Sequence, residues 1–204
     1  HTASVGANDA WGSKATATSN FALTTDIVEK SLAGGVNDDA PDSNTFITAW
    51  GVFEDSETVD VNLLITGPAS TEISQAVVAL AETRKDCVVF VSPQLSSVYA
   101  DSVVDDRQNL NINSSYAIMD SGWKYQYDKY NDKYRWVPLN ADTAGLCART
   151  DDIADPWFSP AGLNRGQIKN VVKLNWNPGT QADRDTLYQS QVNPVVTMAG
   201  QGTV

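Results

Sequence analysis

The chain has 204 residues, of which 42% are hydrophobic and 9% aromatic, so it can form at least one domain with a substantial core. Its 14 Lys and Arg residues against 25 Asp and Glu residues give a net charge of -11, and no basic stripe appears along the sequence. Binding to nucleic acid or to an anionic membrane surface requires such a stripe, so neither is expected as a partner.

The first 42 residues are rich in Ala, Ser, Thr, Asn and Gly and show weak hydrophobic periodicity. We interpret residues 1–42 as loops and short strands, or as the stump of a preceding domain. Residues 43–204 are predicted to form an α/β core domain. Because the chain starts without Met and breaks off in a strand-like segment, we expect it to be a fragment of a longer protein.

The core domain is predicted to begin with a helix and a βαβ unit. Ser43 is the expected N-cap of a helix with apolar side chains at helical spacing. An apolar, β-branched run over residues 59–66 ends at a Gly-Pro pair and favours a buried strand. A helix over 73–81 and a strand over 87–91 follow after short connections, so the two strands should be parallel with a right-handed crossover.

The secondary structure is ambiguous over residues 94–113, whereas residues 114–136 show clear strand patterns. Residues 94–113 contain valines that fit a short helix and asparagines that favour a loop, and both remain open. A third strand is predicted over 114–119. Aromatic and polar residues then alternate over 123–136, which predicts an aromatic hairpin with stabilising cross-strand pairs. Asp142 is expected to cap a helix with a face of small residues around Gly145.

The last part of the chain is predicted to alternate between strands and a helix. Residues 151–167 contain several Pro, Gly and Asn residues and should form a loop. A strand over 168–176, a capped helix over 180–189 and a final strand over 192–198 follow. The predicted fold class is α/β, with a mostly parallel or mixed sheet flanked by helices and an attached aromatic β-hairpin.

Three acidic groups could bind a cation or serve as general acid and base. The groups around Asp38 and Asp101 lack the glycine placement and the terminal Glu of an EF-hand loop. In the group around Asp151 the carboxylates are adjacent in one loop, and such carboxylates seldom lie on opposite sides of a substrate. We therefore predict solvated loops or helix ends instead of sites. The groups are Asp38, Asp39 and Asp42; Asp101, Asp105 and Asp106; and Asp151 and Asp152 with Asp155.

Phosphate binding, stacking of bases or sugars, and His or Cys chemistry have no stronger support in the sequence. Residues 162–166 resemble a glycine-rich phosphate cradle but lack its Gly-Lys-Ser/Thr ending, so we predict a structural turn. The aromatic hairpin could stack bases or sugars, but aspartates dilute its basic residues, so packing against a neighbouring element or subunit is favoured. The only histidine is His1, and Cys87 and Cys147 are predicted to be buried free thiols. We expect no catalytic, cofactor-binding or metal-binding residue.

Three stretches carry a more specific pattern: Ser115–Asp120 followed by Trp123–Asp132 and Arg135–Pro138; Ala144–Asp151; and Trp157–Ile168. They resemble the contractile tail sheath proteins of T-even-type bacteriophages. The Pro-Ala-Gly-x-Asn-Arg-Gly core of the third stretch is the most specific signature. Looser similarity extends over Val59–Gly67, Arg84–Pro93 and Arg184–Pro194, so the whole match covers roughly residues 45–200 in order. Residues before about 32 match poorly, and the segment over 94–113 is shorter than in the family.

The resemblance implies a structural protein and not an enzyme. It implies a subunit of the virion tail sheath that is assembled in the host cytoplasm, polymerises helically around the tail tube and contracts by rigid-body rearrangement to drive that tube through the host envelope. The implied partners are other copies of the chain, the tail tube protein, and baseplate and tail terminator proteins, with no cofactor, no direct nucleic acid contact and no membrane insertion.

Two alternatives stay open. The first is a small-ligand or cation-binding α/β domain. The second, less favoured, is a carboxylate-dependent hydrolase, which would need reactive residues where the parallel strands end. The strand exits read Gly67-Pro68, Ser92-Pro93 and Pro178-Gly179, without a nucleophile-and-base pair.

Two hypotheses concern the third family-like stretch. The loop over 151–167 is expected to be a structural corner that fixes the last strand–helix–strand segment against the core. Trp157 and Phe158 are expected to be anchors, either in the core or at a subunit contact.

Overall fold

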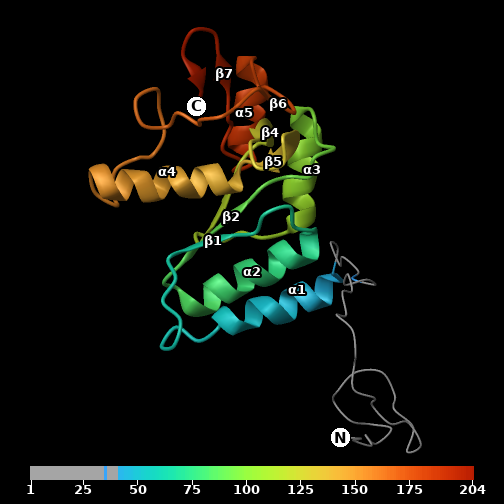
Figure 1. The fold of residues 1–204 in the computed structure, drawn as a ribbon, viewed down its shortest axis with the longest axis vertical. Helices are drawn as coiled ribbons and strands as arrows, with labels where there is room; N and C mark the ends of the chain where they lie inside the picture. The colour runs from blue at the N-terminus through green and yellow to red at the C-terminus, as the bar shows by residue number, and fades with distance from the viewer. Residues whose placement is uncertain (1–34, 36–40) are drawn as a thin grey trace, which may run out of the picture. The chain divides into compact units, whose positions relative to one another are not determined.

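The structure is a computed structural model that describes Gly35 and residues 41–204 (Figure 1). The chain divides into two units, residues 1–39 and residues 40–204, and the helices and strands described all belong to the second. The prediction for residues 1–42 therefore falls outside the described residues, except at Gly35, Pro41 and Asp42. No helix within residues 41–204 has the length and apolar character needed to cross a membrane.

The centre of the second unit is a three-stranded, entirely parallel sheet. Leu64 pairs with Val89, and Phe90 pairs with Ile118. A helix connects each strand to the next, as parallel neighbours require, so the predicted βαβ unit is confirmed. In sheet order the strands are β1 (Leu63–Ile65), β2 (Val88–Val91) and β3 (Ala117–Met119), and the connecting helices are α2 (Thr71–Arg84) and α3 (Ala100–Leu110).

Local signals explain where α2 and α3 begin and end. The Ser70 hydroxyl accepts a hydrogen bond from the Ile73 N–H at the start of α2, and Lys85 ends that helix in the left-handed conformation. Asn111, at φ 46°, ends α3 in the same way. The open region 94–113 is thus mainly helical, and one of its asparagines terminates the helix because Asn tolerates the left-handed region well.

The two faces of the parallel sheet pack against different helices. Val89 and Val91 belong to the main core together with Val77 of α2 and Val103 of α3, all of them buried. Phe90 points to the other face, where it borders a cavity with residues of α4 (Asn140–Ile153). Figure 1 shows α4 and α2 on opposite sides of β1 and β2. The helices flank the sheet as predicted.

The aromatic hairpin is confirmed with its cross-strand pairs. Tyr125 pairs with Trp136 and Tyr127 with Tyr134, and the ring centroids of these pairs lie 4.9 Å and 5.2 Å apart. Such pairs stabilise a hairpin by roughly 0.2–1 kcal/mol each. The hairpin belongs to a separate antiparallel sheet in the order β5-β4-β6, whose strands are β4 (Trp123–Asp128), β5 (Lys133–Pro138) and β6 (Lys173–Leu174).

Four predicted strands are wrong in extent, and the one predicted over 114–119 contributes only β3. The run over 59–66 contributes only β1, because its first half forms a loop whose Val59 carbonyl accepts from Arg84. The segment 168–176 contributes only β6, since Asn170 adopts φ 55° and bends the chain. The segment 192–198 contributes β7 (Thr197–Met198), which pairs with β8 (Gly202–Thr203). The α/β class holds, with one parallel sheet and two small antiparallel sheets in place of one large sheet.

The helix predictions need smaller corrections. Helix α1 (Ser43–Trp50) has Asp42 as its N-cap instead of Ser43, and the short 3-10 helix η1 (Gly51–Phe53) extends it. Helix α4 has Leu139 as its N-cap, so Asp142 lies inside the first turn and is free to bind Lys124. The cap of α5 (Gln181–Gln189) is confirmed, since the Thr180 hydroxyl accepts from the Asp183 N–H at 3.1 Å.

Gly145 is an exposed residue inside α4, and an added Cβ there would meet no atom within 4 Å outside the helix itself. Of the predicted small-residue face, Ala144 is buried within this chain, whereas Gly145 and Ala148 are exposed. We expect Gly145→Ala to raise the free energy of unfolding by up to about 1 kcal/mol, because Ala loses less backbone entropy in a helix. Urea denaturation checks this value, and a destabilised variant would contradict the open environment described here.

Candidate functional site

The C-terminal ends of the three parallel strands meet in a polar cluster, here named the polar junction, which consists of the buried residues Ser92, Asp120 and Asn140 and the half-buried Thr66. The Ser92 hydroxyl donates to Asp120 Oδ2 at 2.6 Å, and the Asn140 N–H donates to Ser92 Oγ at 3.0 Å. Asn140 Nδ2 donates to Thr66 Oγ1 at 3.2 Å and to the Gly67 carbonyl at 2.9 Å. The junction therefore joins all three strand ends to the first turn of α4.

Two neighbouring contacts extend the junction to later parts of the chain. Asp120 Oδ1 accepts from the Gly122 N–H at 3.0 Å, which fixes the bend between β3 and β4. The Ser121 hydroxyl accepts from the Val195 N–H at 2.9 Å. The parallel sheet, the antiparallel sheet and the C-terminal segment are thus connected at one place.

The position of the junction is where open α/β sheets usually bind ligands. Here that position is filled, because Asp120 is 1% exposed, Asn140 is fully buried and the first turn of α4 covers the strand ends. A Ser beside an Asp at a strand end superficially fits the hydrolase alternative. No histidine lies within the described residues to activate the serine, and the pair is closed to a substrate. The arrangement can hold elements together, and it offers no access for chemistry.

Electrostatics add a second property to the junction. Burial raises the pKa of Asp120 to about 7, although hydrogen bonds from Ser92 and Gly122 act in the opposite direction. Burial also raises the pKa of Asp142, whose carboxylate is partly compensated by the Lys124 ammonium 2.7 Å away. Asn140 Oδ1 has no hydrogen-bond partner among the described residues. The junction therefore contains a carboxyl group that is partly protonated at neutral pH.

The strand ends were predicted from the sequence, but the polar junction that they form was not. Ser92 and Asp120 each follow directly after a strand, yet 28 positions separate them and Asn140 lies further along the chain. A usable signal was available, because polar residues that follow successive parallel strands meet at one edge of the sheet. That inference also requires the strand predicted over 114–119 to lie beside the strand predicted over 87–91. The last three residues of the first strand do pair with β2.

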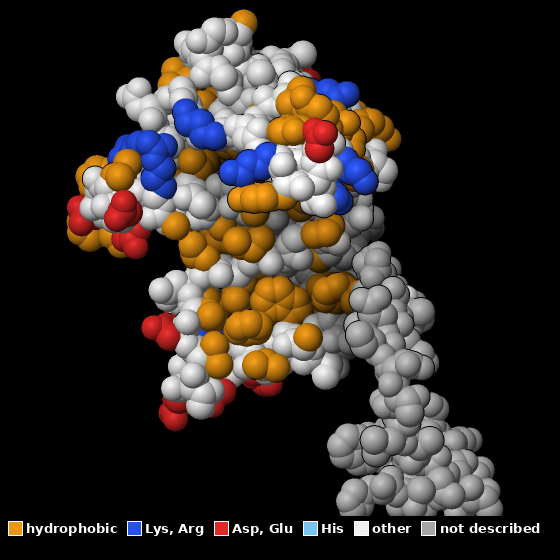
Figure 2. Space-filling model, viewed as in Figure 1, with side chains coloured by type: hydrophobic (Ala, Val, Ile, Leu, Met, Phe, Trp, Pro, Cys, Tyr) orange, Lys and Arg blue, Asp and Glu red, His pale blue; other side chains and the backbone are white. Residues whose placement is uncertain are grey.

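The third family-like stretch contains a second candidate, the exposed aromatic loop of residues 154–167. Trp157 is 78% exposed and Phe158 is 43% exposed, and their stacked rings lie 6.5 Å apart. The Arg165 guanidinium lies 5.2 Å from the centre of the Phe158 ring. These two side chains are not core anchors in this chain, and only the subunit-contact version of the hypothesis remains open. Figure 2 shows hydrophobic, acidic and basic side chains close together at the outer end of α4.

The glycine-rich part of this loop is a structural turn, as predicted. The Gly166 N–H donates to the Gly162 carbonyl at 2.7 Å, and Gly162 has φ +99°. Directly afterwards Ile168 is buried with Leu139 and Val195, and its N–H donates to the Thr203 carbonyl. The turn is followed by this buried contact and not by a helix, in contrast to a phosphate-binding loop.

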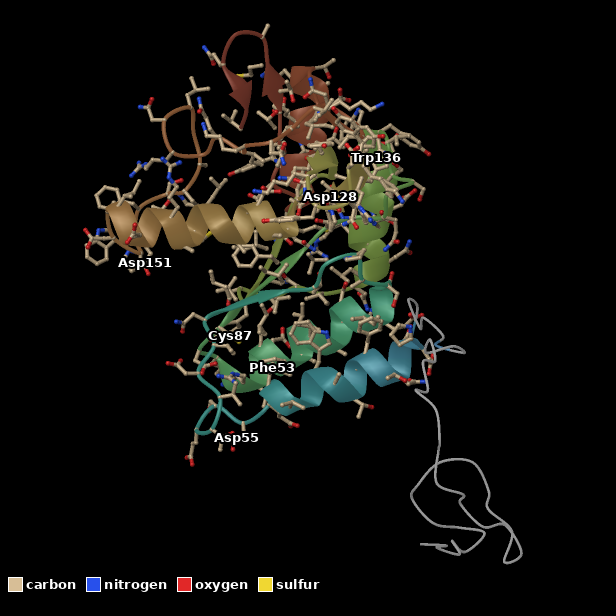
Figure 3. The ribbon with its side chains drawn as sticks, viewed as in Figure 1. Phe53, Asp55, Cys87, Asp128, Trp136 and Asp151 are labelled. Atoms are coloured by element: carbon tan, nitrogen blue, oxygen red, sulfur yellow. The ribbon has the colours of Figure 1, made fainter. Side chains whose placement is uncertain are left out.

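The predicted acidic groups do not converge on a site. Asp106 accepts hydrogen bonds from the Gln94 N–H and the Ser97 hydroxyl, whereas Asp101 and Asp105 are exposed on α3. Asp151 and Asp152 are exposed in the last turn of α4, which extends further than predicted (Figure 3). Within the described residues no three His, Cys, Asp or Glu side chains could hold a metal ion. Asp38 and Asp39 lie outside that part of the chain, so the expectation of no metal site stays a prediction.

Both cysteines have free thiols. Cys87 is buried, as predicted, and Cys147 is half-buried beside the cavity between α4 and the exposed aromatic loop. Burial raises the pKa of both thiols, which favours the uncharged and less reactive form.

Comparison with known proteins gives one consistent result. A family model described as the central domain of the phage tail sheath protein matches residues 39–204. The tail sheath protein of Enterobacteria phage T4 is 44% identical over 196 residues, which cover 85% of this chain and 30% of that protein. The tail sheath protein of Vibrio phage KVP40 is 41% identical over 201 residues, covering 84% and 29%. The chain thus spans about a third of the length of these relatives.

Solved structures of the anti-feeding prophage share the fold. Its helical sheath in the contracted state aligns with a TM-score of 0.58 at 15% identity, covering 82% of this chain and 43% of that one. Its baseplate structure aligns with a TM-score of 0.56 at 14% identity, covering 82% and 42%. At this low identity the likeness concerns the arrangement of helices and strands.

Proposed function

Because this chain belongs to the phage tail sheath protein family, we propose that it is part of the structural subunit of a contractile phage tail sheath. The match of the family model to residues 39–204 carries this proposal. In the proposed role the subunit is a virion component that polymerises around the tail tube in the host cytoplasm, where the tail is assembled. It contracts by rigid-body rearrangement and drives the tube through the host envelope.

The polar junction supports the rigid-body part of this proposal. A contracting sheath has to move subunits against each other while each subunit keeps its own fold. Hydrogen bonds at the junction link β1, β2, β3 and the start of α4, and the Val195 contact adds the C-terminal segment. The elements above and below the sheet therefore move together, and the free energy of contraction is stored in contacts between subunits.

We also propose the partners that follow from this role. They are other copies of the subunit, the tail tube protein, and the baseplate and tail terminator proteins. The subunit has no enzymatic activity and needs no cofactor in this proposal. The closed state of the Ser92–Asp120 pair supports a structural role over the hydrolase alternative.

Expression of the intact gene followed by negative-stain electron microscopy tests the proposal. Hollow, striated tubes of uniform width are the expected result. Monodisperse single particles under conditions that favour assembly would overturn it. The small-ligand or cation-binding alternative would then come first, and a shift of the melting temperature on addition of divalent cations would support it.

The exposed aromatic loop provides a more local prediction. We expect a Trp157→Ala, Phe158→Ala double variant to lose tube formation while the free energy of unfolding of the monomer changes by less than about 1 kcal/mol, because exposed side chains contribute little to stability. Sedimentation of assembled tubes and urea denaturation measure the two effects. The control is Tyr188→Ala, another aromatic residue with 79% exposure, on α5. Unchanged polymerisation in the double variant would remove these residues from the subunit contact.

A further inference from the structure

Basic residues are concentrated in one small part of this acidic chain. Residues 123–138 and 165–174, here named the basic sheet, contain seven of the 14 Lys and Arg residues and only two acidic residues. Lys124 is buried in its salt bridge with Asp142 and Arg165 lies against Phe158, so the exposed basic residues of this sheet are the other five. They comprise β4, β5 and β6 with the segment that leads into β6. Figure 2 shows most of the visible Lys and Arg side chains in the half of the unit that contains this sheet, with one group at the outer end of α4.

The two acidic residues of the basic sheet are engaged within the hairpin. Asp128 forms a salt bridge with Arg135 at 3.1 Å, and Asp132 accepts a hydrogen bond from the Tyr127 hydroxyl at 2.7 Å. Lys129 and Lys133 are exposed and form no salt bridge among the described residues. The Lys129 ammonium lies 5.0 Å from the centre of the Tyr130 ring, which is 86% exposed. Aromatic residues next to cations are typical of protein interfaces.

The opposite end of the unit carries the complementary charge. Residues 54–60, here named the acidic loop, contain Glu54, Asp55, Glu57 and Asp60 and no basic residue, and all four side chains are exposed. Figure 3 shows Asp55 far from the hairpin residues Asp128 and Trp136. Each copy of the chain thus presents a negative surface at one end and a positive surface at the other.

The acidic loop is a preorganised surface. The Arg84 side chain is completely buried, and its guanidinium donates to the carbonyls of Phe53 and Val59 on either side of the loop while it pairs with Asp86 at 2.9 Å. Asp55 accepts from the Glu57 N–H at 2.9 Å and from the Thr58 hydroxyl, which closes the turn between these ends. A surface that is ordered before binding loses little entropy when a partner docks.

We propose that the acidic loop of one subunit docks on the basic sheet of the next copy of this chain. Copies with a net charge of -11 repel each other unless complementary surfaces face each other. A contact between two different surfaces of the same chain is head-to-tail, and it produces an open helical polymer when the rotation does not close. This inference rests on the self-assembly in the proposed function and identifies the surfaces that carry it.

A charge exchange within one chain tests the contact. Glu54→Lys with Glu57→Lys should reduce the yield of tubes from the intact gene by about tenfold or more, and Lys129→Glu with Lys133→Glu should do the same, because like charges then face each other. The chain with all four changes should recover tubes to within about threefold of the unchanged protein, since the charges are complementary again. Asp105→Lys with Asp185→Lys, two exposed positions on α3 and α5, changes the net charge as much as the first pair and should assemble normally.

The outcomes separate this inference from the proposed function. Tubes from the unchanged protein and from both charge-reversed pairs would overturn the contact and leave the sheath function standing. Loss of tubes with the hairpin pair alone, without recovery in the four-change chain, would overturn it in favour of a different partner for the basic sheet. Absence of tubes from the unchanged protein would overturn both.

A measurement on the unchanged protein covers the case in which a variant does not fold. Tubes assembled from a mixture of ¹⁴N and ¹⁵N copies are treated with a carbodiimide, which joins a lysine to a carboxylate only when the two are in contact. Mixed-isotope peptides that join Lys129 or Lys133 to Glu54 or Glu57 are the expected result. Their absence from cross-linked tubes would overturn the contact.

Discussion

Gly166→Val is expected to lower the free energy of unfolding by about 3 kcal/mol, because the added side chain has no space in a closely packed turn. A Cβ at this position would lie 2.8 Å from the Gly162 nitrogen, 2.9 Å from its carbonyl oxygen and 3.0 Å from the Ala161 carbonyl carbon. All three are backbone atoms, so the turn itself has to open. Its 2.7 Å hydrogen bond between Gly166 and Gly162 would then be lost as well.

The same substitution should also abolish tube formation in the intact protein. The turn lies between the exposed aromatic rings of Trp157 and Phe158 and the buried side chain of Ile168, so opening it displaces the proposed subunit contact. Urea denaturation and electron microscopy measure the two effects. Gly166→Ala and Gly145→Ala form a matched pair for the free energy of unfolding. Only Gly166→Ala should lower it, because only Gly166 has backbone atoms against the position of the added Cβ. Intact folding and assembly in Gly166→Val would refute the role of this loop as a structural corner.

The second large effect is a pH dependence that arises from Asp120. Its pKa is about 7 in the folded protein against an ordinary value of 3.8, because burial disfavours the charged carboxylate. Between these two values the folded state holds a proton that the unfolded state has released. The stabilisation from this proton is fully present below about pH 4, decreases as the pH rises toward 7 and is absent above that. The expected slope is roughly 1.4 kcal/mol per pH unit in that window.

Asp120→Asn isolates the contribution of this residue. Asparagine has nearly the same shape and can still accept from the Gly122 N–H, yet it does not titrate. Urea denaturation between pH 4.5 and 8 should therefore give a flatter profile for this variant than for the unchanged protein. Asp105→Asn, at an exposed position of α3, should keep the original profile. Equal slopes for the unchanged protein and Asp120→Asn would show that Asp120 does not bind a proton in this range.

Patterns that depend on neighbouring residues were predicted well. The apolar spacing over 73–81 predicted α2, the alternation of aromatic residues predicted the hairpin, and Thr180 with Asp183 predicted the cap of α5. Each signal lies within a few residues of the structure that it specifies, because helix caps, helix faces and hairpin pairs are local contacts. The stretches that resemble tail sheath proteins were also recognised from short sequence motifs, and the family model that matches residues 39–204 agrees with them.

Strand ends and side-chain partners were predicted less well. A run such as 59–66 has the composition of a strand throughout, but Arg84, from the end of α2, binds the carbonyl of Val59 and holds that part as a loop. Asp is a residue type favoured at helix N-caps, but Asp142 lies inside the first turn of α4, where Lys124 from β4 binds its carboxylate. In both cases a residue from a distant part of the chain competes successfully with the local preference.

The sequence by itself therefore determined the α/β class, the aromatic hairpin and the resemblance to phage tail sheath proteins, because these depend on periodicity and on short motifs. Only the tertiary structure decided that Ser92, Asp120 and Asn140 form one buried junction and that Trp157 is exposed. It also decided that the acidic loop and the basic sheet lie at opposite ends of the unit. These features depend on distances between residues far apart in the chain, and such distances are fixed only when the strands align and the helices pack on them.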